Sequence, residues 1–367
     1  MIKFLDLKNL NLRFSNEFKN VTDSFISSGH YILGDQVSTF ENSFADFCSV
    51  EHCVGVASGF DALLLILEGY KKLGKLKTGD GIIVPANTYI ATILAISKAG
   101  LIPVLVEPDE DTFNLSTKKV KEAISQNTKA IMAVHLYGQL APMKELKALA
   151  EEYELLLLED AAQTHGTILE DKKAGAWGNA SAFSFYPSKN LGALGNAGGI
   201  TTSDNELDDT LRCYRNYGSE KKHVHTQKGL NSRLDELQAA FLSIKLKYLD
   251  SDNAIRRNIA EAFDLGIKNP IITIPKLPEN RLSHVWHLYV IRCKQRDKLK
   301  SYLQGNGVET LIHYPIPPHR QLAYKELNHL SLPLTEEIHA EVLSLPIYPT
   351  LSSSDVNRIV ELLNNFS

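Results

Sequence analysis

The stretch Ser184-Phe185-Tyr186-Pro187-Ser188-Lys189-Asn190-Leu191-Gly192 decides the fold of this chain. It begins at the end of a small, apolar and aromatic run over 180–185, which predicts a buried strand. Pro187 ends that strand, and a glycine-rich turn over 195–199 follows. A lysine in a tight turn after a buried strand can be desolvated, which lowers its pKa and frees its amine to attack a carbonyl.

A second informative stretch lies upstream, where Leu155–Leu158 lead into Glu159-Asp160-Ala161-Ala162-Gln163. The apolar run predicts another strand, with Asp160 at its carboxyl end. Taken alone, a lysine in a loop is usually a solvated charge, and an aspartate after an apolar run is often a helix N-cap. Taken together, a lysine for a Schiff base and an aspartate for a pyridinium nitrogen indicate a pyridoxal 5′-phosphate enzyme, with Lys189 as the catalytic residue.

The order of the remaining elements predicts an α/β fold with a mostly parallel sheet. Helical patterns lie between most of the short apolar segments, and such an alternation places helices on both faces of a parallel sheet. Ligands bind beyond the carboxyl ends of the strands in sheets of this kind, so Asp160 and Lys189 are expected at that edge. The predicted strands are 53–57, 81–84, 103–106, 130–134, 155–159, 180–185 and 199–202, and the predicted helices are 60–73, 88–99, 116–125 and 142–153.

The last third of the chain predicts a smaller α+β domain. A long helical stretch over about 233–263 leads into it, and proline-rich stretches over 315–318 and 346–349 mark loops. A strand over 285–293 and helices near 295–304 and 353–365 are expected there. We therefore predict a large cofactor-binding domain over residues 1–245 and a small domain over 246–367.

Composition excludes several classes of function. The 367 residues carry a net charge of −4 without a long basic run, which argues against a nucleic-acid partner. The four cysteines lie far apart without a C-x-x-C pair, as expected in a reducing cytoplasm, and no signal peptide or membrane-length apolar run is found. The histidines at 223, 225, 313 and 319 lack partners at ligand spacing, so no metal site is predicted.

Three other positions are candidates for binding the cofactor. Ser58-Gly59-Phe60 joins a strand to a helix, where free N–H groups can hold a phosphate, although such a turn is common in any α/β protein. Tyr89 could stack on a planar ring, although aromatic residues fill cores more often. Strand alternation directs Ser184 away from the side to which Phe183 and Phe185 point, so its hydroxyl could reach the phosphate.

These stretches together resemble the DegT/DnrJ/EryC1/StrS family of sugar aminotransferases, which have the aspartate-aminotransferase fold (PLP fold type I). The similarity runs from about Phe4 to the C-terminus and is greatest to the branch that aminates C3 of nucleotide-linked 3-keto-6-deoxyhexoses. The stretches that carry it are 84–92, 134–139, 159–163, 184–195, 215–219, 229–240 and 311–319.

The resemblance implies roles for individual residues. Lys189 would form the Schiff base, Asp160 would hold the ring nitrogen protonated, Gln163 would lie near the ring hydroxyl, and Tyr89 would stack on the ring. Phosphate contacts would come from Gly59, Phe60 and Ser184, and from Asn231 of a second subunit, so a homodimer with shared sites is implied. The implied substrates are L-glutamate and a nucleotide-linked keto sugar. The residues implied to contact substrate are Tyr186, Tyr217, Arg233, Tyr314 and His319.

The sequence is also compatible with other activities. The chain departs from the usual family pattern at Ser58, Ser188 and Asn196. The alternatives are an aminotransferase specific for C4, a PLP-dependent sugar dehydratase of the same family, and a sugar sensor without catalysis. Some dehydratases of the family carry histidine in place of the lysine, so Lys189 favours an aminotransferase.

Overall fold

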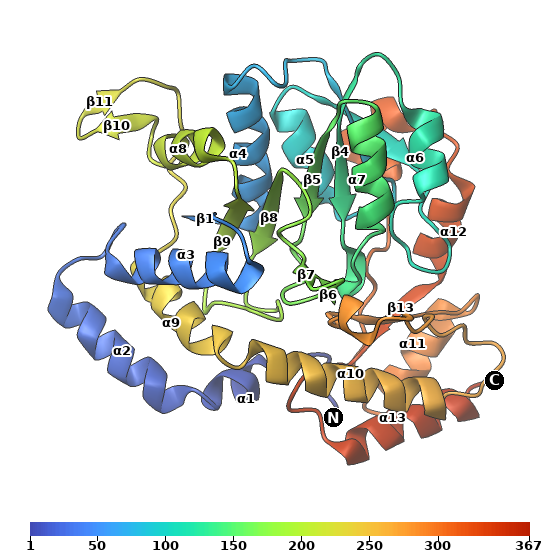
Figure 1. Ribbon diagram of the computed structural model, residues 1–367. Coiled ribbons are helices and arrows are strands. Elements are labelled where there is room, and N and C mark those ends of the chain that lie inside the picture. The colour runs from blue at the N-terminus through green and yellow to red at the C-terminus, as the bar shows by residue number, and fades with distance from the viewer.

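A seven-stranded sheet forms the centre of the computed structural model, which describes residues 1–367 (Figure 1). The strands lie in the order β1-β9-β8-β5-β4-β2-β3, and β9 is antiparallel to both of its neighbours while every other pair is parallel. The predicted α/β fold with a mostly parallel sheet is confirmed. The strands are β1 (His52–Val56), β2 (Gly81–Pro85), β3 (Ile102–Val106), β4 (Thr128–Val134), β5 (Leu156–Asp160), β8 (Ala180–Ser184) and β9 (Gly198–Thr202).

Helices cover both faces of this sheet because its strands are apolar on both sides. In β2, Ile82 and Val84 pack into the cluster under one set of helices, and Ile83 packs into the cluster under the other. The first set is α4 (Gly59–Lys72), α5 (Ile90–Lys98) and α8 (Asn205–Tyr214), and the second is α6 (Thr117–Ala123) and α7 (Met143–Glu152).

Helices before β1 and after residue 235 connect this domain to the rest of the molecule. Helix α3 (Asp35–Cys48) packs on α9 (Glu236–Leu246), preceded by α1 (Leu7–Leu12) and α2 (Ser15–Ser28). The helical stretch predicted over about 233–263 is divided into two helices, because α9 ends before Lys247 and α10 (Leu249–Gly266) starts after Tyr248. The ring of Tyr248 packs on Phe14, and its hydroxyl bonds Glu17, so the break is fixed by the N-terminal helices.

The C-terminal residues form a second core around an antiparallel pair of strands, β12 (Tyr289–Arg292) and β13 (Val342–Leu345). The strand predicted from 285 begins only at Tyr289, because Trp286 has a φ of 47° and Leu288 N–H bonds Tyr137 O. Ile2 and Leu5 also pack on this core. The division at residue 245 stays a prediction, and the packing adds the first residues of the chain to the C-terminal core. Its helices are α11 (Arg296–Gly305), α12 (Pro333–Glu341) and α13 (Ser353–Asn365).

Short elements complete the chain. They are the hairpins β6–β7 (Ile168–Leu169, Lys172–Lys173) and β10–β11 (Ser219–Lys221, Val224–His225), and the 3₁₀ turns η1 (Leu136–Gly138), η2 (Arg281–Ser283), η3 (Pro318–Arg320) and η4 (Leu322–Leu327). None of the helices combines the length and the apolar character that crossing a bilayer requires. No group of three or more potential metal ligands is found.

Candidate active site

The carboxyl ends of the parallel strands border a cavity of about 230 Å³. Asp160 is the last residue of β5, Ser184 is the last of β8, and Tyr89 follows β2. Eight of the predicted site residues line this cavity, which we call the cofactor cavity: Gly59, Phe60, Tyr89, Asp160, Gln163, Ser184, Tyr186 and Lys189. The structure thus brings together residues that lie up to 130 positions apart in the chain.

Lys189 is held in the turn that follows β8. Its N–H donates to the carbonyl of Tyr186 at 2.8 Å, which fixes the turn. Burial lowers the pKa of Lys189 to about 8, while the charge of Asp160 opposes that change. The lowered pKa was predicted from the position after a buried strand. This amine therefore loses its proton more readily near neutral pH than an ordinary lysine does, and its uncharged form is nucleophilic.

Asp160 presents an ionisable carboxyl group to the same cavity. Its Oδ2 accepts a hydrogen bond from the Thr92 hydroxyl at 2.8 Å, and its Oδ1 accepts one from the Ala162 N–H at 3.2 Å. Burial raises the pKa of Asp160 above its usual value, and these hydrogen bonds and the charge of Lys189 oppose the rise. The carboxylate can also pair with a cationic group, and such a partner would lower the pKa of Asp160.

The amino end of α4 forms an anion cradle at the other end of the cavity. Ser58 caps the helix by accepting from the Asp61 N–H at 3.1 Å, so the N–H groups of Gly59 and Phe60 belong to the unpaired first turn. A Cβ on Gly59 would lie 2.6 Å from the Cβ of Ser184. Only glycine therefore allows the helix to approach β8 this closely. Ser184 is partly exposed while Phe183 and Phe185 are buried, as strand alternation predicted.

The side chain of Gln163, which also lines the cavity, forms hydrogen bonds with two tyrosines. Its Oε1 accepts from the Tyr137 N–H at 2.6 Å, and its Nε2 donates to the Tyr314 hydroxyl at 3.1 Å. The ring of Tyr314 lies 4.9 Å from that of Tyr89, with a tilt of 34° between them. Tyr314 does not line the cavity itself, but it contacts two residues that do, Gln163 and Tyr89.

A buried group behind the cavity was not singled out from the sequence. The carboxylate of Glu159 accepts from the N–H groups of Gly175, Trp177 and Gly178 and from the Ser181 hydroxyl. It also accepts from His135 Nε2 at 2.9 Å, because the Ala141 N–H occupies Nδ1 of that ring. Burial would raise the pKa of Glu159, but these hydrogen bonds hold it below its usual value. Glu159 therefore anchors the end of β5, on which Asp160 lies.

Four predicted site residues lie elsewhere in this single chain. Asn231 is exposed and pairs with Asn216 through the backbone, while Arg233 lies over the ring of Tyr217. His319 is fully buried and bonds Glu336 through Nε2 at 3.0 Å. The position of His319 does not support the predicted direct contact with a sugar, since its ring is enclosed by the chain away from the cofactor cavity.

The cavity fits pyridoxal 5′-phosphate. A nucleophilic lysine, a carboxylate with capacity for a pyridinium nitrogen, and an anion cradle are the three groups that this cofactor requires, and all three line one cavity. Thr92 and Thr88 support Asp160, and His135 and Glu159 support the end of β5. They were missed because Thr92 lies 68 positions from Asp160, and His135 lies 24 positions from Glu159.

Comparison with known proteins agrees with this chemistry. Residues 13–364 match the model of the DegT/DnrJ/EryC1/StrS aminotransferase family. The chain is 51% identical over 366 residues to a dTDP-3-amino-3,6-dideoxy-alpha-D-galactopyranose transaminase of Aneurinibacillus thermoaerophilus, covering 100% of this chain and 99% of the relative. It is 43% identical to a dTDP-3-amino-3,4,6-trideoxy-alpha-D-glucose transaminase of Streptomyces venezuelae, covering 100% and 96%.

Solved structures show the same relationship. DesV of S. venezuelae, determined in complex with a ketimine intermediate, superposes with a TM-score of 0.95 at 43% identity, covering 99% of this chain and 97% of DesV. NtdA of Bacillus subtilis with bound cofactor PMP has a TM-score of 0.89 at 31% identity, covering 98% and 83%. The chain belongs to the DegT/DnrJ/EryC1/StrS aminotransferase family and is a pyridoxal 5′-phosphate-dependent transaminase.

Proposed function

We propose that this enzyme transfers the amino group of L-glutamate to C3 of a nucleotide-linked 3-keto-6-deoxyhexose, with dTDP as the nucleotide. The observation that carries the proposal is the full-length similarity to relatives named as transaminases of dTDP-3-amino sugars, at 51% and 43% identity. The cofactor cavity supplies the groups that the reaction needs.

The cofactor, when bound, stores the amino group between the two half-reactions and withdraws electrons from the carbon that loses a proton. Lys189 would attach it covalently and, once released, would act as the base that takes the proton from Cα of glutamate. In the second half-reaction the same amine would deliver a proton to C3 of the sugar. Its lowered pKa of about 8 suits an amine that must both accept and release protons near neutral pH.

Three other sets of side chains would hold the cofactor in place. Asp160, kept ionised with the help of Thr92, would hold the proton on the ring nitrogen. The N–H groups at the start of α4 and the Ser184 hydroxyl would bind the phosphate. Gln163 would lie beside the ring hydroxyl, and Tyr89 would cover the ring face.

Tyr186 and a second subunit would complete the sugar site. Tyr186 lies at the mouth of the cavity and is 54% exposed, so its hydroxyl is available to a ligand. Leu194 and Tyr217 are exposed apolar side chains outside the cavity. A second copy of the chain would cover such side chains, and its Asn231 is the residue that we propose contacts the phosphate. We therefore propose a homodimer with shared sites.

Turnover with matched sugars tests the proposal. The enzyme, cofactor and L-glutamate would be incubated with 3-keto and 4-keto nucleotide sugars, and NMR would locate the new amine. A higher kcat/KM for the 3-keto sugar supports the proposal, and a clear preference for the 4-keto sugar would contradict the assignment to C3. Loss of a hydroxyl without amination would indicate a dehydratase, and binding without turnover would indicate a sensor.

A further inference from the structure

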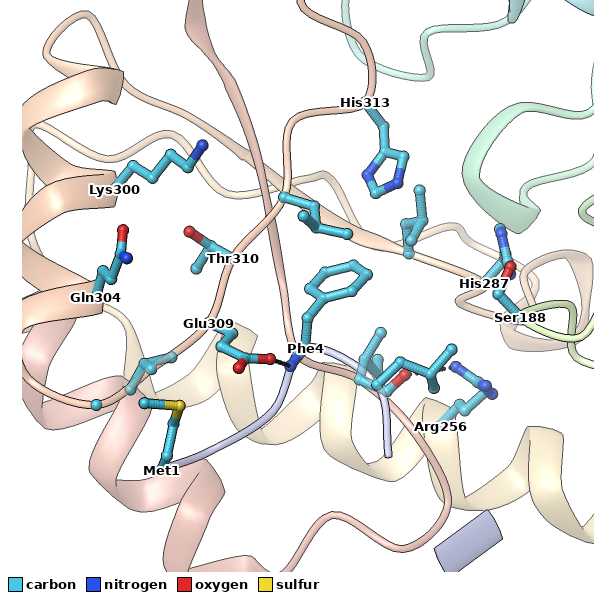
Figure 2. Close-up of a pocket in the computed structure, with 16 residues that line it drawn as sticks. Met1, Phe4, Ser188, Arg256, His287, Lys300, Gln304, Glu309, Thr310 and His313 are labelled. Atoms are coloured by element: carbon cyan, nitrogen blue, oxygen red, sulfur yellow. Dashed lines mark hydrogen bonds between the residues drawn. The ribbon is translucent and has the colours of Figure 1, made fainter. Parts of the chain in front are cut away.

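A second and larger cavity, of about 560 Å³, lies between the start of the chain and the C-terminal core (Figure 2). We call it the N-terminal cavity, because Phe4 and Leu5 form one of its walls. It shares no lining residue with the cofactor cavity. Ser188 lines the N-terminal cavity, whereas the next residue, Lys189, lines the cofactor cavity, so the two lie on opposite sides of one turn.

One end of the N-terminal cavity carries three hydrogen-bond donors. Lys300 and Gln304 are four residues apart on α11 and therefore share a face of that helix. Thr310 faces them from the segment before the 311–319 loop, and Figure 2 shows all three side chains at the end remote from Ser188 and His287. This end combines an ammonium, an amide and a hydroxyl group, which together match an anionic oxygen group.

The hydroxyl of Thr310 is buried without a hydrogen-bond partner at this end of the cavity. The residue is 6% exposed, and its Oγ1 has no hydrogen-bond partner in the protein. Leaving a buried hydroxyl unpaired is unfavourable, and such groups in native proteins usually have a partner. Lys300 likewise forms no ion pair, although it lines the same cavity. A bound anion would supply a partner to Lys300, and to Thr310 once rotation about its Cα–Cβ bond turns the covered hydroxyl toward the cavity.

The charge balance of the lining favours the same class of ligand. Arg256 is 4% exposed, and its Nη1 donates only to the carbonyls of Trp286 and Ile347, at 3.3 and 2.6 Å. Burial lowers the pKa of His313 to about 4 and that of His287 well below its usual value, so both rings are neutral.

The one carboxylate of the lining belongs to Glu309, and its Oε2 accepts from the Phe4 N–H at 3.1 Å. Figure 2 shows this bond directed toward the start of the chain. The side chains of the lining therefore supply two cations, Arg256 and Lys300, and a single carboxylate, which accepts a hydrogen bond from the Phe4 N–H.

We propose that the N-terminal cavity binds a small organic anion, whose carboxylate or phosphate group is held by Lys300, Gln304 and Thr310. Phe4, Leu5 and Leu311 would contact the apolar part of the ligand. The site does not depend on the identity of the sugar, because it lies outside the cofactor cavity. An occupant extending to Ser188 would contact the residue that precedes the catalytic lysine.

Calorimetric titration of the cofactor-loaded enzyme tests this proposal. Glutarate, a dicarboxylate without an amino or keto group, and inorganic phosphate serve as separate probes in a buffer free of other binding anions. Lys300→Met, Gln304→Leu and Thr310→Val each remove one donor, and Thr310→Val keeps the shape of the side chain. Lys298→Met is the matched control, because Lys298 is exposed on the same helix. Thermal melting verifies that each variant is folded.

We expect at least one probe to bind, and the donor variants to weaken it at least about tenfold, equivalent to about 1.4 kcal/mol. The control should stay within about twofold of the wild type, as a solvated charge contributes little. Preference for glutarate or for phosphate identifies the group that is bound. The proposal is overturned if neither probe binds, if binding is unchanged in the folded donor variants, or if Lys298→Met weakens it equally.

Discussion

The hydroxyl of Thr92 donates to Oδ2 of Asp160 at 2.8 Å and lies 2.9 Å from the hydroxyl of Thr88. Because the single proton of Thr92 is directed to Asp160, Thr88 is the donor to Thr92. Both threonines are buried, and they form a short chain of hydrogen bonds that ends on the carboxylate. This chain stabilises the ionised form of Asp160, the form that a protonated ring nitrogen requires.

Thr92→Val should therefore raise the pKa of Asp160, since a hydrogen bond to the charged form is lost. On the acid side of the pH profile we expect kcat to fall about tenfold, the effect of about one pKa unit. The acid limb of the pH profile of kcat should move to higher pH, because Asp160 would accept a proton at a higher pH than in the wild type. Thr88→Val, which removes only the outer bond, should produce a smaller movement. An acid limb that does not move in Thr92→Val would contradict this role.

Asp160→Ala should reduce catalysis much more than cofactor binding. The phosphate cradle at Gly59 and Ser184 remains in this variant, while the partner of the ring nitrogen is absent. We expect kcat to fall by at least about 100-fold, the scale of a positioned proton-transfer group, with the affinity for the cofactor changed much less. Stopped-flow measurement of both half-reactions and equilibrium dialysis of the cofactor provide the two quantities. Near-normal turnover would exclude the proposed pairing with the ring nitrogen.

The lowered pKa of Lys189 predicts how the stability of the cofactor-free protein depends on pH. The folded state has a pKa of about 8 for this group, against an ordinary value of 10.5. Below pH 8 Lys189 is protonated in both the folded and the unfolded state, and its desolvated charge lowers the stability of the folded protein by the full amount. Between pH 8 and 10.5 the folded state releases the proton while the unfolded state keeps it, so the wild type gains stability with rising pH.

Lys189→Met should consequently be more stable than the wild type at pH 7, and the difference should narrow as the pH rises from 8 toward 10.5. Urea unfolding of both cofactor-free proteins across this range measures the effect. The exposed Lys298→Met variant is the control for removing a lysine. A stability difference that stays constant with pH would show that Lys189 is not desolvated.

The sequence predicted the parts of the site that depend on neighbouring residues. Lys189 and Asp160 each follow an apolar run directly, so the strand and its terminal side chain could be inferred together. The five donors to Glu159 come from residues 135 and 175–181, so no local pattern signalled them. An apolar run also carries no direction, which is why the antiparallel orientation of β9 was not predicted.

Side chains on loops were the hardest to place from the sequence, because their contacts also come from distant parts of the chain. The Pro315–Pro318 loop was expected to bring both Tyr314 and His319 to a sugar. Tyr314 does reach Gln163, but the next turn of the chain carries His319 into contact with Glu336. The position of a loop side chain depends on contacts made by elements far away in the sequence, here α12.

Asn231 provides a test of whether two subunits share each site. It is exposed and lies outside the cofactor cavity of its own chain, so any contact with the cofactor would have to come from a partner. We expect Asn231→Ala and Lys189→Ala to be inactive alone, the first because the phosphate loses a ligand. A heterodimer of the two would combine Lys189 of one subunit with Asn231 of the other and contain one intact site. Random exchange would then restore about a quarter of the sites of a symmetric dimer.

Mixing Lys189→Ala with Asp160→Ala is the matched control for this rescue. Both residues line the same cavity of one chain, so no heterodimer of these variants has an intact site, and activity should stay absent. Subunit exchange can be followed with two affinity tags, and activity is measured after exchange is complete. Recovery in the Asn231 mixture alone would demonstrate a shared site. Failure of both mixtures despite complete exchange would contradict a site that is shared through Asn231.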